Sequence, residues 1–317
     1  MKNLKIRLLA FALLLVATGL SAAEREAFSV IVLPDTQNYA EKFPDTYVAQ
    51  TQWIRDNVEK ENIKFVMHLG DIVQHHNDSE EQWLVADKAH RLLDGAVPYS
   101  MTPGNHDLEY KDKVYSRETR LYNKYFGPQR FADYPWYGGH WGENNDNNYC
   151  TFGADGMKFL VISLEYAPRD EVLTWATEVA ANHPEHRVMV ATHCYMRPAG
   201  RDSKAGGSLG NSGDGVWEKF VRRSPNVFLV TSGHVLGVGR QVSNNDADLP
   251  VHEMLVDYQG LPNGGDGWLR IMKFVPDENK IEIRAYSPLL DETMESDGHT
   301  FTLEYEMTPE AALKKAG

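Results

Sequence analysis

The sequence predicts an α/β fold with a parallel sheet and crossover helices, and three observations support this prediction. Between residues 28 and 101, short β-rich apolar runs alternate with segments whose apolar residues recur at helical spacing. Such alternation is typical of parallel strands joined by helices. It resumes after residue 157 and gives way to a strand-rich tail. Polar residues and glycines follow the strands, at the positions where open α/β sheets bind their ligands.

The first five elements are predicted from apolar spacing and from the residues that end strands and helices. Pro34 stops the first apolar run, and Gly95 ends the second helical segment. The predicted order is strand 28–33, helix 46–60, strand 65–69, a helix from about 85 to 95, and strand 97–101.

The rest of the chain divides into an aromatic segment, a second α/β stretch and a strand-rich tail. Residues 108–149 lack clear periodicity and contain many tyrosines and tryptophans, which favours an ordered functional lid over a disordered insert. Strands at 158–163, 188–191 and 227–231 and helices at 170–181 and 216–222 follow. We expect strands 254–256, 268–274 and 281–286 to form a second, mixed or antiparallel sheet packed on the first. Residues 291–317 are interpreted as a C-terminal extension that packs on the domain or trails from it.

The N-terminus has the pattern of a secretory signal peptide, predicted at residues 1–23. Three basic residues precede an apolar run at residues 8–20, and Ala22 and Ala23 supply small residues of the kind that signal peptidase recognises. A membrane anchor is the alternative, but a run of about 13 residues is shorter than the roughly 20 that span a bilayer. We therefore expect cleavage near Ala23, export to a periplasm or the medium, and no transmembrane segment afterwards.

Removal of this segment leaves a strongly acidic chain. The 317 residues carry a net charge of −13, and the first 23 contain three basic and no acidic residues, so the mature charge is −16. Such a surface repels phosphate backbones, so we expect no nucleic-acid partner. An anionic substrate then requires a local positive centre, which bound metal would supply. Cys150 and Cys194 are the two cysteines of the sequence, and whether they form a disulfide stays open.

Residues of metal-ligand type follow five of the predicted strands. Carboxylate, amide and imidazole groups at adjacent strand ends can converge on two cations, and an aspartate can bridge them. A glycine before the ligand lets the backbone come close to the site. A single loop aspartate or histidine is more often a turn former or a core residue, but five such motifs in order make coincidence a poor explanation. The motifs are Asp35-Thr36-Gln37, Gly70-Asp71, Gly104-Asn105-His106-Asp107, Thr192-His193 and Gly233-His234.

On these motifs the chain resembles the calcineurin-like metallophosphoesterases, over a domain of residues 27–290. The resemblance implies an α/β four-layer αββα sandwich of two mixed β-sheets flanked by helices, with two divalent metal ions that hydrolyse phosphate esters. Asp35 would belong to the first metal, and Asp71 would bridge the first and second metals. The second metal would be completed by Asn105, His193 and His234.

Two histidines of the family pattern are missing, and both would serve the first metal. Gln37 stands where the first motif has His, and Leu236 stands where the last motif, Gly-His-x-His, has its second His. The first site would therefore have oxygen ligands, including the Gln37 amide, which suit a hard ion such as Mg or Mn. Mixed nitrogen and oxygen ligands at the second site also suit Zn or Fe. His75 and His76 are possible replacement nitrogen donors, although a solvated polar loop is the simpler interpretation.

The implied reaction is attack on a phosphate ester by a hydroxide that bridges the two metals, with His106 and Asp71 as catalytic residues. His106 would donate a proton to the leaving oxygen or hold a phosphoryl oxygen. The expected substrate is a small phosphorylated molecule, most simply a monoester. The residues expected to bind it are Asn105, His106, Arg197 and Tyr110, of which the arginine suits phosphate.

Two other functions stay open on the sequence alone. A phosphodiesterase acting on nucleotide, phospholipid or glycan diesters needs room for a second ester arm, which the aromatic segment would decide. A noncatalytic exported binding protein would be consistent with a decayed first site. Retention of Asp35, His106 and the whole second site speaks against decay, because a binding relic would not need all of them.

Overall fold

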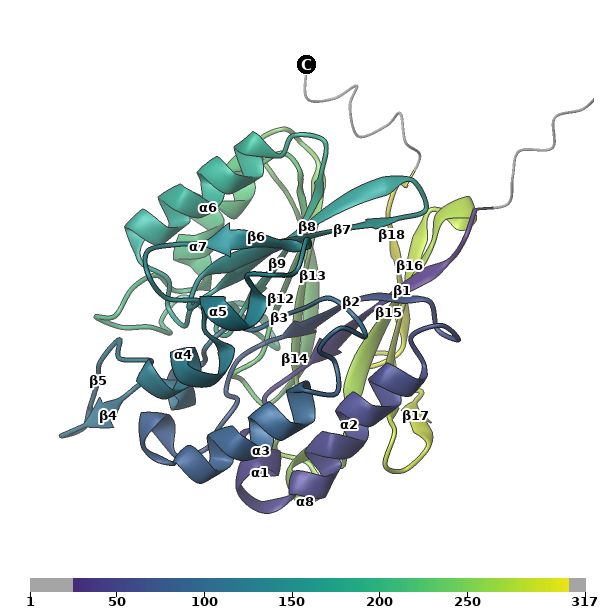
Figure 1. The fold of residues 1–317 in the computed structure, drawn as a ribbon. Helices are drawn as coiled ribbons and strands as arrows, with labels where there is room; N and C mark the ends of the chain where they lie inside the picture. Colours follow the sequence, from purple (N-terminus) through teal and green to yellow (C-terminus); the bar gives the residue numbers. More distant parts are fainter. Residues whose placement is uncertain (1–24, 308–317) are drawn as a thin grey trace, which may run out of the picture.

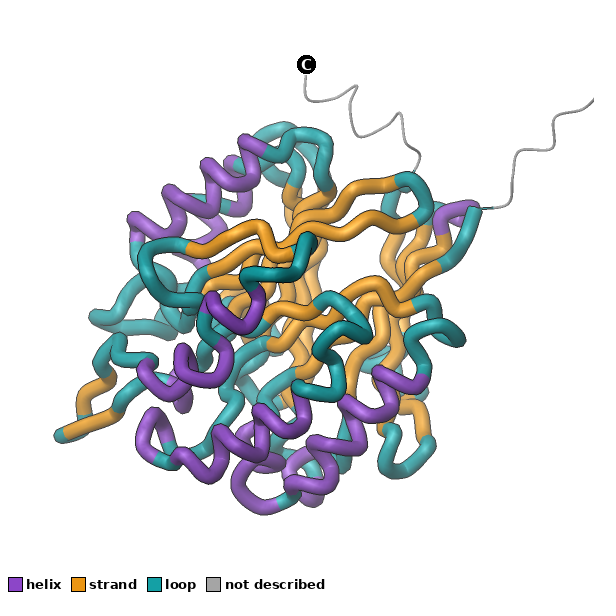
Figure 2. The backbone as a smooth tube through the Cα atoms, viewed as in Figure 1, coloured by secondary structure: helices purple, strands orange, loops and turns teal. Residues whose placement is uncertain are grey.

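The protein folds into four layers, with two β-sheets in the middle and helices on both outer faces (Figure 1). The computed structural model describes residues 25–307, so the signal peptide predicted at residues 1–23 lies outside the described residues. Strands occupy the interior and helices lie outside them, as the colours of Figure 2 show. The αββα sandwich expected from the sequence is therefore confirmed.

The first sheet contains, in spatial order, β17 (Glu292–Met294), β16 (Lys280–Ser287), β15 (Leu269–Val275), β1 (Phe28–Leu33), β2 (Ile63–His68) and β3 (Tyr99–Ser100), with β18 (Phe301–Glu304) paired on β16. β1, β2 and β3 are parallel, as the alternation of strands and helices predicts. β15 pairs antiparallel with β1, so the sheet is mixed.

The second sheet contains, in spatial order, β13 (Gly237–Asn244), β14 (Pro250–Asp257), β12 (Val227–Ser232), β9 (Arg187–Thr192), β8 (Met157–Leu164), β7 (Asn148–Ala154) and β6 (Tyr137–His140). Its central strands β14, β12, β9 and β8 are parallel, and antiparallel strands complete both edges. Two short hairpins lie outside the sheets: β4 (Tyr110–Lys111) with β5 (Val114–Tyr115), and β10 (Met196–Arg197) with β11 (Gly200–Arg201).

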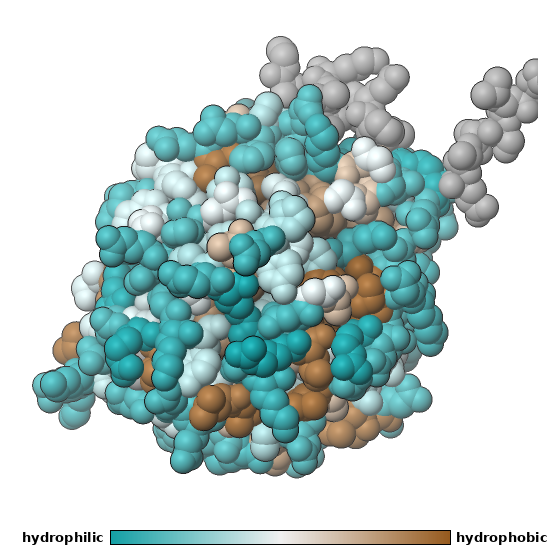
Figure 3. Space-filling model, in the orientation of Figure 1, coloured by the Kyte–Doolittle hydropathy of each residue, from teal (hydrophilic) through white to brown (hydrophobic). Residues whose placement is uncertain are grey.

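The helices form the two outer layers. On the first sheet lie α1 (Gln37–Lys42), α2 (Pro44–Asp56), α3 (Glu80–His90), α4 (Arg120–Phe126) and α5 (Pro128–Phe131). On the second sheet lie α6 (Asp170–Asn182) and α7 (Gly213–Lys219), and the short α8 (Pro262–Gly265) follows β14. Between residues 25 and 307, no helix is long and apolar enough to span a membrane. Figure 3 shows a mostly hydrophilic surface in this view, with scattered apolar patches.

Aromatic side chains fill the space between the two sheets. Phe28 and Phe274, which are partners across β1 and β15, stack with ring centroids 4.7 Å apart. Phe159 of the facing sheet lies 5.5 Å from the first ring and 5.6 Å from the second. Burying each such side chain stabilises the fold by about 1.5–3 kcal/mol. Cys150 and Cys194 are free and belong to different apolar clusters, so the core and not a disulfide holds the layers together.

The strand-rich tail does not form the separate second sheet that we expected. β14 joins the second sheet, but β15 and β16 return to the first sheet, where β15 pairs with β1. This prediction was wrong because a short apolar run indicates that a strand forms without indicating which sheet edge it joins. β2 pairs with one edge of β1, and β15, from much later in the chain, pairs with the other edge.

Residues 108–149 contain more regular structure than a lid requires. Tyr122, Phe126 and Phe131 of α4 and α5 are buried against the first sheet, and β6 extends the second sheet. The hairpin β4–β5, by contrast, projects from the body of the molecule (Figure 1) and carries the exposed Tyr110. Most aromatic residues of this segment therefore serve the core, and the hairpin is the part that can act as a lid.

Strands of both sheets bring their carboxyl ends to one region, and the loops there have unusual backbone geometry. Asp35 follows β1, Asp71 follows β2 and His234 follows β12, and their φ angles are +21°, +50° and +73°. Positive φ is strained for residues with a Cβ, and such strain persists mainly where the surrounding structure enforces it, as at functional sites.

Candidate metal centre

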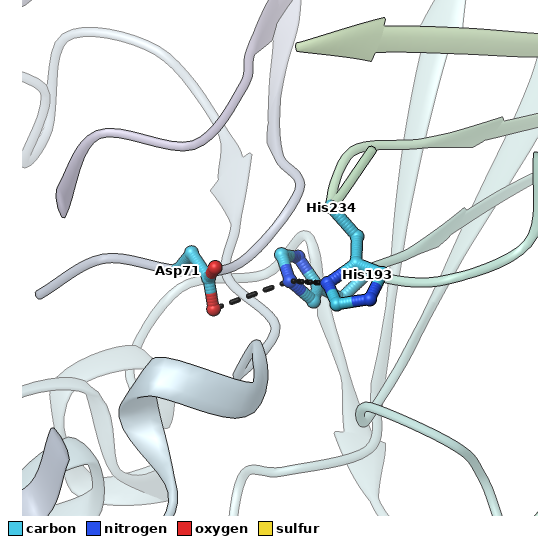
Figure 4. A group of neighbouring side chains, drawn as sticks. All are labelled: Asp71, His193 and His234. Carbon is cyan, nitrogen blue, oxygen red and sulfur yellow. Dashed lines mark hydrogen bonds and ion pairs between the residues drawn. The ribbon is translucent and has the colours of Figure 1, made fainter. Parts of the chain in front are cut away.

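Three side chains from three loops converge at this edge (Figure 4). They are Asp71 after β2, His193 after β9 and His234 after β12. One potential ligand atom from each lies within 4.8 Å of the others. All three residues were expected as metal ligands from the sequence, and the fold brings them together from both sheets.

The imidazole of His193 lies at the centre of this group. Its Nδ1–H donates to the Leu69 carbonyl at 2.9 Å, an orienting contact typical of metal-ligating histidines. Its Nε2 lies 3.2 Å from Asp71 Oδ1, 3.1 Å from Asn105 Oδ1 and 3.2 Å from His234 Nδ1. Because Nε2 carries either one hydrogen or one lone pair, it satisfies at most one of these neighbours. A cation among the four atoms would satisfy them all, so these residues fit a metal ion.

Asp35 lies next to the same group. Its Oδ1 accepts the backbone N–H of His234 at 3.0 Å and lies 3.9 Å from His193 Nδ1. Its Oδ2 is buried without a hydrogen-bond partner among the described residues. A Cβ on Gly233 would lie 2.0 Å from this Oδ2. The glycine that precedes His234 is therefore required by the close approach of the Asp35 carboxylate.

Gln37, expected in place of a motif histidine, reaches Asp71, the residue expected to bridge the two metals. Its Nε2 donates to Asp71 Oδ2 at 3.1 Å and also to Gln259 Oε1. Its Oε1 is buried and has no hydrogen-bond partner within residues 25–307. Since an amide group can turn over and exchange its oxygen and nitrogen, Gln37 can present an oxygen ligand beside Asp71.

The short helix η2 (Asn105–Asp107) places His106 beside these groups. Its backbone N–H donates to Asp71 Oδ1 at 2.9 Å, and its Nδ1–H donates to the Gln74 carbonyl at 2.8 Å. The second bond fixes the ring and leaves Nε2 available for a proton that can be donated. His106 therefore adjoins the group of potential ligands without lying at its centre.

Asp107 organises the loops around the centre. Its carboxylate accepts backbone N–H groups of Ile72 at 2.9 Å, Val73 at 3.1 Å and Gly104 at 2.7 Å. Burial, and then the charge of Asp71, raise the pKa of Asp107 to about 7. The bonds to Ile72 and Val73 tie the loop after β3 to the loop after β2, and the bond to Gly104 closes the loop after β3 on itself. Together they account for the final residue of the Gly-Asn-His-Asp motif.

The charges of the centre favour bound cations. Burial, followed by the charges of Asp257 and Asp71, raises the pKa of Asp35 well above its usual range. Burial opposes ionisation of Asp71, but His193, His106 and His234 together outweigh this effect and lower the Asp71 pKa. Burial, and then His193, lower the pKa of His234 to about 4, so this imidazole is neutral near pH 7. Against the effect of burial, the charge of Asp71 in turn raises the pKa of His193. Crowded carboxylates beside imidazoles are a donor set that divalent cations stabilise.

A buried chain of hydrogen bonds supports the loops after β1 and β2. The Gly70 N–H donates to His68 Nδ1 at 3.1 Å, so the His68 Nε2–H donates to Thr36 Oγ1 at 2.9 Å. The Thr36 hydroxyl donates to Tyr47 OH at 2.8 Å, and Tyr47 donates to His90 Nε2 at 3.0 Å. Burial lowers the pKa of His68 to about 3, so the chain stays neutral.

The two histidines considered as replacement donors lie in different environments. His75 is exposed, and its Nε2 lies 3.0 Å from Glu41 Oε1. His76 stacks on His106 with ring centroids 5.2 Å apart and planes 9° apart, and it also stacks on Tyr110 at 4.9 Å. The rings of His106, His76 and Tyr110 therefore form a continuous aromatic border beside the centre.

Arg197, expected to bind phosphate, is paired with a carboxylate. Its Nε lies 2.6 Å from Asp202 Oδ2, although its side chain is 54% exposed. The nearby Arg201 forms an ion pair with the buried Glu253 and stacks on Trp217, so its contacts are with the protein itself.

Two polar residues at the site, Asp257 and Gln259, come from a polar stretch after a strand that the sequence left open as a border of the site, without assigning either residue as a ligand. Asp257 ends β14 and is 2% exposed. Gln259 donates to its carboxylate from Nε2 and from the backbone N–H, both at 2.9 Å, and accepts from Gln37. The signal was present, because a polar Asp-Tyr-Gln stretch follows a strand there, but the position of that strand in the sheet was unknown.

Comparisons with known proteins agree with this geometry. A model of the calcineurin-like phosphoesterase family matches residues 28–237. The chain is also 34% identical over 284 residues to YvnB, an uncharacterized protein of Bacillus subtilis strain 168. The match covers 87% of this chain and 21% of YvnB, so the chain spans about a fifth of that relative's length.

Two solved structures share the fold at low sequence identity. Purple acid phosphatase PPD1 from yellow lupin (Lupinus luteus) superposes with a TM-score of 0.55 and 13% identity, over 89% of this chain and 55% of that chain. A dimetal phosphatase from Danio rerio superposes with a TM-score of 0.54 and 13% identity, over 88% of this chain and 99% of that chain.

Proposed function

The chain belongs to the calcineurin-like phosphoesterase family, a family of phosphoric ester hydrolases, and from this premise we propose that it hydrolyses phosphate monoesters at two divalent metal ions. The observation that carries the proposal is the convergence of ligand atoms on His193 Nε2, which a cation alone would satisfy. The proposed ligands of the second metal are Asp71, Asn105, His193 and His234, and those of the first metal include Asp35, Gln37 and Asp71.

The residues of the chain divide the work of the reaction. Bound divalent cations would lower the pKa of water and neutralise charge on the phosphoryl oxygens. Asp71 lies where it can join both metal sites, since its Oδ1 faces His193 and its Oδ2 faces Gln37. His106, held through Nδ1 by the Gln74 carbonyl, donates a proton from Nε2 to the leaving oxygen.

Monoesters are the simplest substrate class for this centre. A single phosphoryl group can engage the metals, the Asn105 amide and His106 together, and a monoester needs no further pocket. The net negative charge of the chain repels an anionic substrate, so the metals supply the attraction for it.

Phosphodiesters are the second candidate, and two observations favour them. Arg197 is already paired with Asp202, so it offers less charge for the second negative charge of a monoester dianion. The border of His76 and Tyr110 beside His106 provides aromatic faces against which a second, flat ester arm could pack.

Parallel assays on an aryl phosphate monoester and a bis-aryl phosphate diester, with Mn²⁺ added, test the proposal. We expect turnover of the monoester to exceed that of the diester, and Asp71→Asn to reduce both by at least about 100-fold. The reverse preference would select the second candidate. Absence of metal-dependent turnover on either substrate would refute the proposed function.

We also propose that the chain is exported. The support is the basic, apolar and small-residue pattern of residues 1–23, which lie outside the described residues. N-terminal sequencing of the mature protein from the producing cell should begin at Glu24. A mature protein that begins at Met1 would contradict export through this segment.

A further inference from the structure

We infer that Asp257, at the carboxyl end of β14, is a ligand of the first metal and replaces the imidazoles that this chain lacks at positions 37 and 236. The inference rests on the proposed two-metal site and adds a ligand to it. It comes from the pairing of two strands, a chain of hydrogen bonds and unpaired oxygen atoms in the buried centre.

The pairing of β13 with β14 brings Asp257 to the place of the missing histidine. Leu236 occupies the position of the second His in the last motif, and Gly237, the next residue, is the register partner of Asp257. Directly opposed residues of antiparallel strands have Cα atoms about 4.5–5.5 Å apart. The Leu236 side chain itself is 58% exposed and lies against Gly260, so it is not directed into the centre. The carboxylate-bearing end of β14 thus lies beside the position from which the family motif supplies an imidazole.

A continuous set of hydrogen bonds links Asp257 to the bridging aspartate. Asp71 Oδ2 accepts from Gln37 Nε2 at 3.1 Å, and the same nitrogen donates to Gln259 Oε1. Gln259 Nε2 in turn donates to Asp257 Oδ2 at 2.9 Å. One connected group of oxygen-bearing side chains, at the carboxyl ends of β1, β2 and β14, therefore includes Gln37 and reaches the residue paired with Gly237.

The charges and unpaired atoms of this group indicate a cation. Asp35, Asp71 and Asp257 are each 2% exposed, and no lysine or arginine is paired with any of them among the described residues. The buried atoms Asp35 Oδ2 and Gln37 Oε1 have no hydrogen-bond partner in the described part of the chain. A divalent cation would neutralise the carboxylates and satisfy both oxygens. With carboxylate and amide donors alone, the site suits Mn²⁺ or Mg²⁺ better than Zn²⁺.

A purely structural role for Asp257 makes a different prediction. If the carboxylate only orients Gln259, the nearly isosteric Asp257→Asn variant keeps an acceptor oxygen for one of the two Gln259 bonds, and the affinity for both metals should stay within a few-fold of wild type. If the carboxylate binds the metal, the loss of its charge weakens the first site specifically. Metal content separates these roles without reference to activity.

The experiment counts Mn²⁺ in the full mature chain by inductively coupled plasma mass spectrometry and measures its dissociation constants by electron paramagnetic resonance of free Mn²⁺. The wild-type chain should bind two ions. Asp257→Asn should keep the tighter ion and bind the other at least about tenfold more weakly, in line with ligand-environment effects on metal affinity. The matched control is Asp146→Asn, which alters a buried carboxylate bonded to Thr119 and Asn123, and it should bind two ions normally.

A rescue variant resolves the case in which Asp257→Asn loses both ions. Adding Leu236→His to Asp257→Asn restores the imidazole of the family motif, so the double variant should regain the ion of the first site and bind Zn²⁺ there in preference to Mn²⁺. Failure of this rescue, or two ions with wild-type affinity in Asp257→Asn, would overturn the inference and leave the proposed function intact. Fewer than two ions in the wild-type chain would overturn the proposed function and the inference together.

Discussion

Removal of one buried hydroxyl should destabilise the protein and loosen the loops that carry the proposed metal ligands. In Tyr47→Phe, the Thr36 hydroxyl loses its acceptor at 2.8 Å and His90 Nε2 loses its donor at 3.0 Å. All three side chains are fully buried, so water cannot replace the missing partner. Leaving a buried polar group unpaired costs about 1–3 kcal/mol, and two such groups give an expected loss of about 3 kcal/mol in the free energy of unfolding.

The matched control is Tyr122→Phe, which removes another fully buried hydroxyl on the same side of the first sheet. Tyr122 donates to the carbonyls of Met101 and Asn145 at 3.1 and 3.2 Å. Both carbonyls also accept from Asn148 Nδ2 at 2.9 Å, so they keep a partner in the variant. We expect this change to cost about 1 kcal/mol.

Urea unfolding of the wild-type chain, Tyr47→Phe and Tyr122→Phe measures these costs. Unfolding is monitored by tryptophan fluorescence at one fixed Mn²⁺ concentration. A second readout is Mn²⁺ affinity, which should fall in Tyr47→Phe and stay unchanged in Tyr122→Phe, because Thr36 lies between Asp35 and Gln37. If Tyr47→Phe costs no more than Tyr122→Phe and binds Mn²⁺ normally, the hydrogen-bond chain does not support the metal loops.

Three further predictions concern other residues. His106→Ala should reduce turnover by about 100-fold or more while the chain still binds two metals in a metal-content measurement, since His106 adjoins the ligands without joining them; loss of a metal would contradict this role. Burial raises the pKa of Asp146 to about 6, so the folded protein binds a proton here more tightly than the unfolded chain. The free energy of unfolding should therefore fall by up to about 3 kcal/mol as pH rises from about 4 through 6. Urea titrations should show a flatter pH dependence in Asp146→Asn, and an unchanged dependence would contradict this assignment. A Cβ at Gly104 would lie 2.2 Å from Asp71 Oδ1 and 2.3 Å from the Asp71 backbone nitrogen. Gly104→Ala should therefore weaken metal binding by about tenfold or more. Normal metal binding in this variant would show that the loop can move aside.

The sequence predicted elements well where local chemistry marks their limits. The strand at 28–33 was placed correctly because it is a continuous apolar run that Pro34 ends. β13, at Gly237–Asn244, was missed because it is an edge strand with glycines and alternating exposed residues, and its run of apolar residues is too short to stand out. The six-residue α1 was missed for a similar reason, since it is too short for helical periodicity to show.

Long-range pairing is what the sequence did not specify. The strand-end rule placed Asp71, His193 and His234 together, because the rule depends only on parallel strands meeting at one edge. It left open whether Asp257 borders the site, because the position of this residue depends on β14 lying beside β12 and opposite β13. The ion pair between Arg197 and Asp202 was not predicted either. It depends on the turn of the β10–β11 hairpin, which the sequence pattern did not indicate.

Anomalous X-ray scattering from a crystal of the Mn²⁺-loaded mature chain tests the two-metal centre most directly. We predict two peaks about 4 Å apart on either side of Asp71. One peak should lie within ligand distance of Asn105, His193 and His234, and the other within ligand distance of Asp35 and Asp257. A single peak, or two peaks that do not share the Asp71 carboxylate, would contradict the proposed centre.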